Sequence, residues 1–277
     1  MSNLNFLLFG VYPFVALAVL VIGCWARFDL SQYTWKAGSS QFLHDRNFRI
    51  ASVLFHVGIL FILAGHFVGL LIPEAIYHHV ISTSNKQLLA MVSGGIFGTL
   101  CLIGLLMLIH RRMFNPRVRA SSSASDILVL WVLLAQLLLG LATIPASAGH
   151  MDGSVMVMLA NWAQYTVTFQ PALAAAAIEP VSLVYKLHVF LGLSLFVLFP
   201  FTRLVHIVSA PVWYLVAVIR LSASRPASHS RKVRQPRRRP ETVMPGAPGL
   251  IDIPVVNPGA AIGTLGGRPV AQAPRQE

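Results

Sequence analysis

The sequence predicts an all-α integral membrane protein, a bundle of five transmembrane helices. Of its 277 residues, 56% are hydrophobic and 11% are charged, and the mean hydropathy is +0.69. A soluble domain carries about 25% charged residues. Five apolar windows reach the roughly 20 residues that a helix needs to cross a bilayer. Helices are favoured because a spanning segment must satisfy its backbone polar groups internally.

The five predicted spans cover, in chain order, about residues 5–26, 51–71, 88–109, 127–144 and 183–208. A sixth uncharged segment, residues 158–178, is too polar for a span, and we expect an interfacial or loop helix there. Its polar and helix-breaking residues are Asn161, Gln164, Thr166, Thr168, Gln170 and Pro171.

Basic residues alternate between the predicted loops, which sets the expected topology. The first and third loops each hold four Lys or Arg residues, and the second holds only Lys86. The fourth loop, residues 145–182, holds no Lys or Arg. Because Lys and Arg are concentrated in cytoplasmic loops, we expect the N-terminus outside and the C-terminus in the cytoplasm. A sixth span would place the arginine-rich tail outside.

Two domains are expected: a membrane domain over residues 1–221 and a basic, disordered cytoplasmic tail over 222–277. The tail is rich in Arg, Pro, Gly and Ser, a composition that does not form a packed core. The net charge of +12 is interpreted as a topology signal and as contact with anionic lipid, with no nucleic-acid partner expected. The two cysteines give no disulfide framework and no cysteine-based metal motif.

Four of the ten histidines fall inside spans: His56 and His66 on the second, His188 and His206 on the fifth. Ionisable groups at membrane depth mark functional sites. His56 and His66 are separated by about 15 Å along an ideal helix, whereas two nitrogens that bind one metal ion lie only about 4 Å apart. The pairs must therefore form between helices, and antiparallel spans pair His56 with His206 and His66 with His188.

The spacings of the histidines along their two helices agree less well with this pairing. On one continuous helix His188 and His206 share a face but are about 27 Å apart, against about 15 Å on the partner helix. Pro200 lies between them and should kink the fifth span. The sequence alone does not close this difference.

Two histidines at each depth in an apolar bundle favour low-spin haem b, since zinc takes four protein ligands, or three with an open position. Small residues beside the histidines either leave room for the macrocycle or serve helix packing: Gly58, Ala64, Gly65, Gly69 and Gly192. Arg111, Arg112 and Arg203 either pair with haem propionates or only set the orientation.

Two haems at different depths would form an electron wire. The chain has no iron–sulfur, flavin or nucleotide motif, so the substrate-reducing chemistry should belong to partner subunits. A quinol, a lipid-soluble two-electron donor, suits the other end of the wire. Lys86 either hydrogen-bonds a quinol oxygen or is an ordinary interfacial anchor.

The sequence resembles the gamma subunit, a cytochrome b, of membrane-bound respiratory nitrate reductase. The resemblance covers residues 4–217 but not the alanine-rich segment 170–180 or the tail. The matching motifs are GVYPFVA from Gly10, QYTWKAGSSQ from Gln32, LFHVGILFILAGHFVGLL from Leu54, CLIGLL from Cys101, FNPRVRA from Phe114, TIPASAGHMDGS from Thr143 and KLHVFLGLSLFVLFPFTRLVHI from Lys186.

This resemblance implies two b haems in a bacterial inner membrane. His66 and His188 would ligate the distal haem near the outer face, and His56 and His206 the proximal haem near the inner face. Lys86 matches the quinol-site lysine. In addition, Gly65 matches a glycine beside the distal haem and Arg112 a basic residue near a haem propionate.

The implied reaction oxidises ubiquinol or menaquinol at the outer side. Electrons would pass to an iron–sulfur beta subunit and then to a molybdenum-containing alpha subunit that reduces nitrate to nitrite. Two alternatives stay open at this point. One is a cytochrome b serving another oxidoreductase, against which the motifs TWKAGSS and HMDGS argue. The other is a haem-free anchor or transporter with a buried histidine network.

Overall fold

The structure, a computed structural model, describes residues 2–30 and 46–208, and these ranges consist of helices joined by short turns and loops, with no strand among them. Five of the described helices are long and apolar enough to cross a membrane: Asn3–Leu30, Arg46–Leu71, Thr83–Phe114, Ala124–Ala148 and Leu183–Phe201. The predicted fold class is confirmed. The expected tail, residues 222–277, and the motif from Gln32 lie outside the described residues.

Short helices and turns link the long ones. The elements are α1 (Asn3–Phe6), a π-helical turn (Leu7–Val11), α2 (Tyr12–Leu30), α3 (Arg46–Leu71), α4 (Glu74–Tyr77), α5 (Thr83–Phe114), α6 (Pro116–Ala120), α7 (Ala124–Ala148), α8 (Ser154–Val167), α9 (Pro171–Ile178), α10 (Leu183–Leu198) and 3₁₀ turns at Phe199–Phe201 and Arg203–Val205.

Polar residues fix where the helices begin. Ser82 accepts a hydrogen bond from the Asn85 amide at the start of α5. Ser123 and Asp126 form a reciprocal capping box at the start of α7. Such caps satisfy amide groups that have no partner within the helix. The apolar stretches that follow then continue as helix because their backbone groups bond internally.

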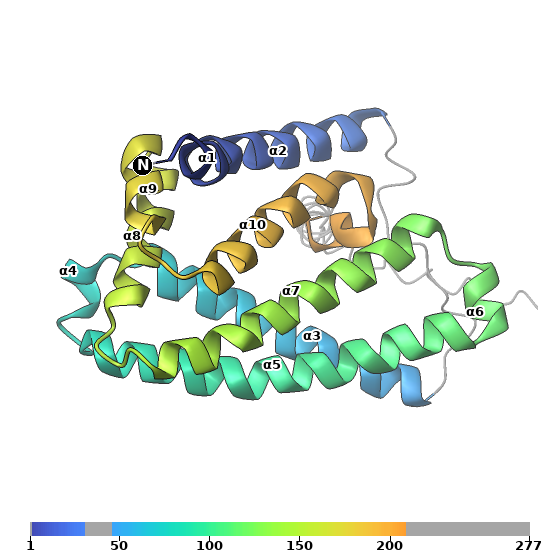
Figure 1. Ribbon diagram of the computed structural model, residues 1–277. Helices are drawn as coiled ribbons and strands as arrows, with labels where there is room; N and C mark the ends of the chain where they lie inside the picture. Colours follow the sequence, from blue (N-terminus) through green and yellow to red (C-terminus); the bar gives the residue numbers. More distant parts are fainter. Residues whose placement is uncertain (1, 31–45, 209–277) are drawn as a thin grey trace, which may run out of the picture. The chain divides into compact units, whose positions relative to one another are not determined.

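The long helices lie side by side, with α4, α8 and α9 at one end and α6 at the other (Figure 1). We name these the Lys86 end, where α5 begins, and the Asp126 end, where α7 begins. Helix α3 packs along α5, α5 against α7, α7 against α10, and α10 against α2. Helices α3, which carries His56 and His66, and α10, which carries His188, are not close-packed neighbours in the described part of the chain.

Glycines allow the close approach of α3 and α5. A Cβ atom on Gly58 would lie 2.7 Å from the Cys101 backbone nitrogen, and one on Gly104 would lie 2.4 Å from the Phe55 nitrogen. Both distances are shorter than van der Waals contact, so only glycine fits while the backbones touch. Packing thus explains Gly58, one of the small residues that the sequence left open between packing and cofactor space.

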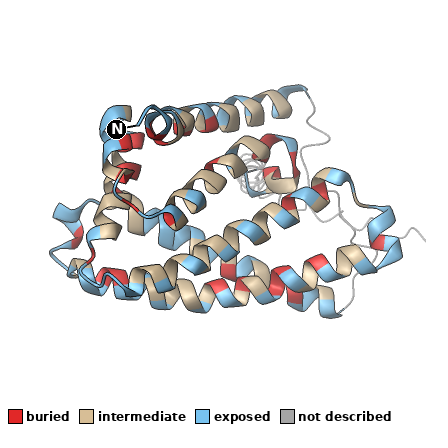
Figure 2. Ribbon diagram, viewed as in Figure 1, coloured by how far each residue is buried: buried red, intermediate tan, exposed pale blue. Residues whose placement is uncertain are grey.

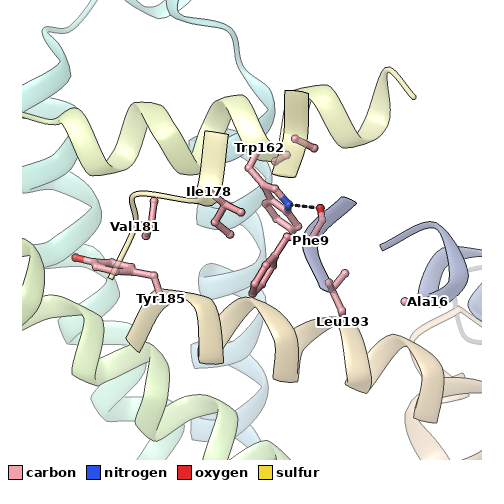
Figure 3. Packing of buried hydrophobic residues seen from close by; sticks show 9 residues of the cluster. Phe9, Ala16, Trp162, Ile178, Val181, Tyr185 and Leu193 are labelled. Carbon is pink, nitrogen blue, oxygen red and sulfur yellow. Dashed lines mark hydrogen bonds between the residues drawn. The ribbon is translucent and has the colours of Figure 1, made fainter. Parts of the chain in front are cut away.

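The largest buried apolar cluster joins α8, α9 and α10 to the N-terminal segment (Figure 3). The Trp162 indole nitrogen donates to the Phe9 carbonyl oxygen at 3.0 Å. Asn5 donates through its amide to the Ala175 carbonyl oxygen at 2.8 Å. Elsewhere the long helices expose apolar side chains to their surroundings (Figure 2), among them Val53, Leu60, Phe61 and Phe67 of α3. Such a surface suits lipid rather than water.

The fifth span is not one helix through His206. Helix α10 ends at Leu198, and Thr202 is extended, with φ −126° and ψ −177°. Pro200 therefore ends the helix instead of kinking it. The expectation that His188 and His206 share a helix face is wrong, and the 27 Å spacing computed for a continuous helix does not apply. As expected, α8 and α9 are too short to span.

The glycine contacts predict how α5 tolerates a methyl group. Gly104→Ala should lower the stability of the purified protein in detergent by about 1–3 kcal/mol, because the methyl group would overlap α3. Gly94→Ala on the same helix should be neutral or slightly stabilising, since a Cβ there meets nothing within 4 Å and alanine favours helix. Thermal unfolding midpoints measure both. Equal midpoints for the two variants would contradict the proposed packing.

Candidate functional site

At the Asp126 end, His56 of α3 and His206 after the helix break lie together. Their ring centres are 6.3 Å apart, with the ring planes 70° from parallel. His56 Nδ1 lies 2.7 Å from the Ser52 carbonyl oxygen, and His206 Nδ1 lies 2.5 Å from the Arg203 carbonyl oxygen. Because a carbonyl oxygen only accepts, each Nδ1 carries the proton. Each Nε2 is therefore left with a lone pair that can bind a metal ion.

Towards the Lys86 end, His66 of α3 and His188 of α10 form a second pair, with ring centres 5.9 Å apart and planes 40° from parallel. His66 Nδ1 lies 2.8 Å from the Ile62 carbonyl oxygen, so its Nε2 also carries a lone pair. His188 differs, because its buried Nδ1 has no hydrogen-bond partner among the described residues. A Cβ on Gly140 would lie 2.9 Å from the His188 ring.

The spacing within each pair suits two axial ligands of one metal ion. With metal–nitrogen bonds of about 2 Å, imidazoles on opposite sides of one metal ion have ring centres about 6 Å apart. In residues 2–30 and 46–208, no three His, Cys, Asp or Glu side chains gather at a common point suited to a metal ion. A haem, which brings four equatorial nitrogens of its own, fits two-ligand sites between helices that are not close-packed.

The glycines near the histidines divide into two kinds. A Cβ on Gly192 would lie 3.1 Å from the Gln136 amide nitrogen, so Gly192 serves packing of α10 on α7. A Cβ on Gly65, beside His66, meets nothing within 4 Å in the described structure. Helix packing therefore does not account for Gly65, which stays a candidate for the face of a cofactor.

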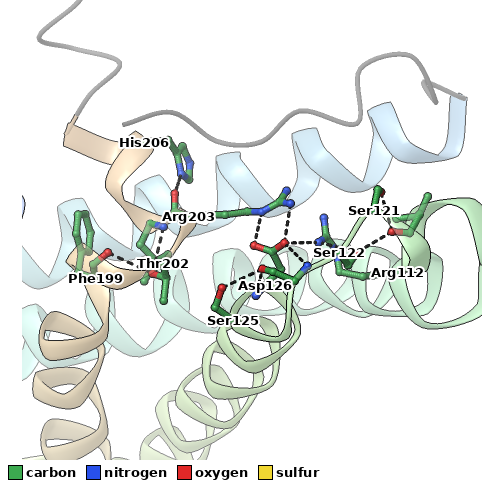
Figure 4. A network of polar contacts seen from close by, with 12 residues as sticks. Arg112, Ser121, Ser122, Ser125, Asp126, Phe199, Thr202, Arg203 and His206 are labelled. Carbon is green, nitrogen blue, oxygen red and sulfur yellow. Dashed lines mark hydrogen bonds and ion pairs between the residues drawn. The ribbon is translucent and has the colours of Figure 1, made fainter. Parts of the chain in front are cut away.

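A buried carboxylate organises the Asp126 end (Figure 4). Asp126 accepts two hydrogen bonds from Arg203, one from Nε to Oδ1 and one from the terminal nitrogen to Oδ2 at 2.7 Å. Arg112 lies 3.4 Å from the same carboxylate and donates to Ser122 at 3.0 Å. Arg112, expected beside a haem propionate, is placed against Asp126 and Ser122 of its own chain.

Arg27 of α2 holds the break in the fifth span from the other side. It donates to the carbonyl oxygens of Pro200 and Thr202, at 2.5 and 2.9 Å. These bonds satisfy carbonyl groups that lose their helical partners where the helix ends. A surface hollow of about 280 Å³ lies beside Arg27 and Asp126, lined mostly by polar side chains. The end of the fifth span is thus fixed by side chains of α2 and α7.

Lys86 lies in the first turns of α5 and is buried, with 7% of its surface exposed. Its Nζ has no hydrogen-bond partner among the described residues and lies 3.6 Å from the centre of the Tyr77 ring. The next residue, Gln87, donates to the carbonyl oxygens of Ser147 and His150, at 3.0 and 2.8 Å. This local order places an unsatisfied ammonium group near the His66–His188 end of the bundle.

Three residues of these sites were not identified from the sequence. Asp126 could have been found as the acid of a capping box, S-x-x-D, before an apolar run. Gly140 opposes His188 from another helix, and no local signal marks that contact. Tyr77 precedes Lys86 by nine positions, too far to be a helical neighbour, and only the turn between α3 and α5 brings it to the ammonium group.

Comparison with known proteins gives a consistent result. Residues 5–225 match the family model described as nitrate reductase gamma subunit. The respiratory nitrate reductase 1 gamma chain of Escherichia coli (strain K12) is 49% identical over 225 residues, 81% of this chain and 100% of that protein. The nitrate reductase gamma chain of Bacillus subtilis (strain 168) is 36% identical over 210 residues, covering 76% and 93%.

The Asp126 contacts predict a stability effect. Asp126→Asn should lower stability by about 3 kcal/mol, because it leaves two arginines without their buried counter-charge. Asp152→Asn, at an exposed carboxylate that accepts hydrogen bonds from Ser154, should change little, since asparagine also caps helices. Thermal unfolding in detergent measures both. An Asp126→Asn protein as stable as the Asp152→Asn protein would rule out this role.

Proposed function

Since the chain belongs to the nitrate reductase gamma subunit family and is a membrane subunit of respiratory nitrate reductase, we propose that it is the quinol-oxidising cytochrome b of that enzyme. It holds two b haems, takes electrons from ubiquinol or menaquinol, and delivers them to an iron–sulfur beta subunit. A molybdenum-containing alpha subunit then reduces nitrate to nitrite. The complex lies in the bacterial inner membrane.

The observation that carries this proposal is the presence of two two-histidine sites, one between α3 and α10 and one between α3 and the segment after the break in the fifth span. Ring-centre distances of 5.9 and 6.3 Å would allow each pair to hold one iron. His66 and His188 would hold the haem nearer the Lys86 end, and His56 and His206 the haem nearer the Asp126 end. Iron bound in this way supplies one-electron transfer.

The protein itself sets the ligand chemistry. Carbonyl groups at Ser52, Ile62 and Arg203 receive the Nδ1 protons of three of the histidines, which orients each ring and makes Nε2 the ligand atom. Gly65 leaves space beside His66 for a flat cofactor face. Arg112 lies 3.4 Å from Asp126 at the same end of the bundle, where its positive charge would favour a propionate.

The Lys86 end is proposed as the outer, quinol-binding end. The Lys86 ammonium group donates a hydrogen bond to a quinol oxygen and stabilises the negative charge that develops as the hydroxyl proton leaves. Oxidation of one quinol to quinone releases two protons and two electrons. With the protons released outside and the electrons consumed inside, turnover charges the membrane. The basic residues at the Asp126 end, which include Arg111, Arg112 and Arg117, support a cytoplasmic location for that end.

The pairing predicts which haem each variant loses. His66→Leu and His188→Leu should lose the same haem, and His56→Leu and His206→Leu the other, so that each protein keeps about half the b-type absorbance. Reduced-minus-oxidised spectra and haem quantification of the purified protein measure this. His110→Leu, an exposed histidine that stacks on Phe114, is the control and should keep both haems. If His56→Leu and His66→Leu lose the same haem, the pairing is wrong.

The quinol role of Lys86 predicts a loss of activity without a loss of cofactor. Lys86→Met should lower kcat/KM for quinol about ten- to a hundredfold, the effect of one charge-assisted hydrogen bond, and should keep both haems. Lys186→Met is the matched control at the same end of the bundle, since Lys186 donates to the Glu179 carbonyl oxygen at 2.8 Å. Haem loss confined to Lys86→Met would instead indicate a structural role.

A further inference from the structure

The Tyr77 ring lies against the buried ammonium group of Lys86 at the quinol end. The Lys86 Nζ atom lies 3.6 Å from the centre of the Tyr77 ring, which is close contact for a cation over an aromatic face. Both side chains are buried, with 9% of Tyr77 and 7% of Lys86 exposed. The Nζ atom makes this contact while having no hydrogen-bond partner in the described part of the chain.

An aromatic face stabilises a cation in a way that a carboxylate does not. A carboxylate beside Lys86 would take up its N–H groups in hydrogen bonds and compete with a ligand for them. The ring attracts the charge through its electron-rich face, and the N–H groups stay available. The arrangement therefore holds the ammonium group in place with its N–H groups available to donate to an oxygen atom.

The nearby carboxylate is held elsewhere. Glu74 Oε1 lies 2.9 Å from His78 Nε2, one helical turn away. The same His78 nitrogen lies 2.9 Å from the Thr83 hydroxyl oxygen. The acid that could neutralise Lys86 is thus paired with a residue of its own turn.

The Tyr77 ring is itself fixed by its surroundings. Its hydroxyl group lies 3.3 Å from the Thr83 hydroxyl oxygen, and its ring stacks on His78 with centres 5.2 Å apart. Its carbonyl oxygen accepts from the amides of Val80 and Ile81, both at 2.9 Å. The short helix α4 and the turn after it therefore present one face of the ring to Lys86 in a defined position.

We propose that Tyr77 is a positioning residue of the quinol site, which holds the Lys86 ammonium group by a cation–π contact and leaves its N–H groups free for a quinol oxygen. The proposal rests on the proposed quinol role of Lys86. It makes the segment between α3 and α5, which carries Tyr77, a part of the quinol site that contacts Lys86. Without the ring, the flexible lysine side chain extends towards the surface, where water solvates its charge.

The test uses the complete enzyme in membranes, with a short-chain ubiquinol as electron donor and nitrate as acceptor. Tyr77→Leu should raise KM for this quinol about tenfold, as expected for loss of a desolvated cation–π contact, with kcat and both haem spectra nearly unchanged. Tyr77→Phe keeps the ring face and loses only the hydroxyl group. It should stay within about twofold of the original protein, because phenylalanine also binds cations.

A double variant separates this inference from the proposed function. In a Lys86→Met background, Tyr77→Leu should have no further effect on KM, since residues that act through one another are not additive. Suppose that Lys86→Met weakens quinol use, while Tyr77→Leu either has no effect or strengthens quinol binding. The inference about Tyr77 then fails and the proposed function stands. If Tyr77→Phe is as damaged as Tyr77→Leu, or if Tyr77→Leu loses a haem, the ring face is not what matters. If Lys86→Met itself leaves KM and kcat unchanged, the quinol role fails.

Discussion

The position of His206, and so of the pair that it forms with His56, depends on the ion pair between Asp126 and Arg203. The fifth span ends where Pro200 interrupts it, and a free chain end in that position could take many directions. Two hydrogen bonds from Arg203 to a buried carboxylate fix one direction, and the Arg203 carbonyl oxygen then accepts from His206 Nδ1. The Asp126–Arg203 contact thus couples the orientation of the His206 ring to the position of α7. Removing one partner of a buried pair is costly because the other charge stays behind.

The sequence predicted the five spans because hydropathy over 20 residues depends on local composition and on little else. The pairing of His56 with His206 and His66 with His188 followed from spacing and antiparallel order, and the structure places the rings of each pair together. Whether the rings bind haem stays a proposal. The difference between the histidine spacings on the two spans could not be resolved from the sequence. The direction of the chain after Pro200 is set by Arg27 and Asp126, which are distant in sequence.

The same limit applies at the quinol end. Lys86 could be singled out because it is the only basic residue of the second predicted loop. Tyr77 could not, because its contact depends on the fold of the turn between α3 and α5. Likewise, Gly58, Gly65 and Gly192 looked alike in the sequence. Only the distances to neighbouring atoms separate the two that serve packing from Gly65, where a methyl group would meet nothing.

The partners of the first helix carry a consequence for how the protein is made. Helix α2 packs on α10 and on the turn at Pro200, with Gly23 giving the room, and Tyr12 hydrogen-bonds Ser194 at 3.0 Å. These partners are synthesised more than 150 residues later, since chains emerge N-terminus first. The first helix therefore enters the bilayer before its partner helix has been synthesised. It stays surrounded by lipid while α3, α5 and α7 assemble. Insertion of the fifth span brings in His188 and His206, the second member of each histidine pair. It also provides the surface of α10 on which the first helix packs.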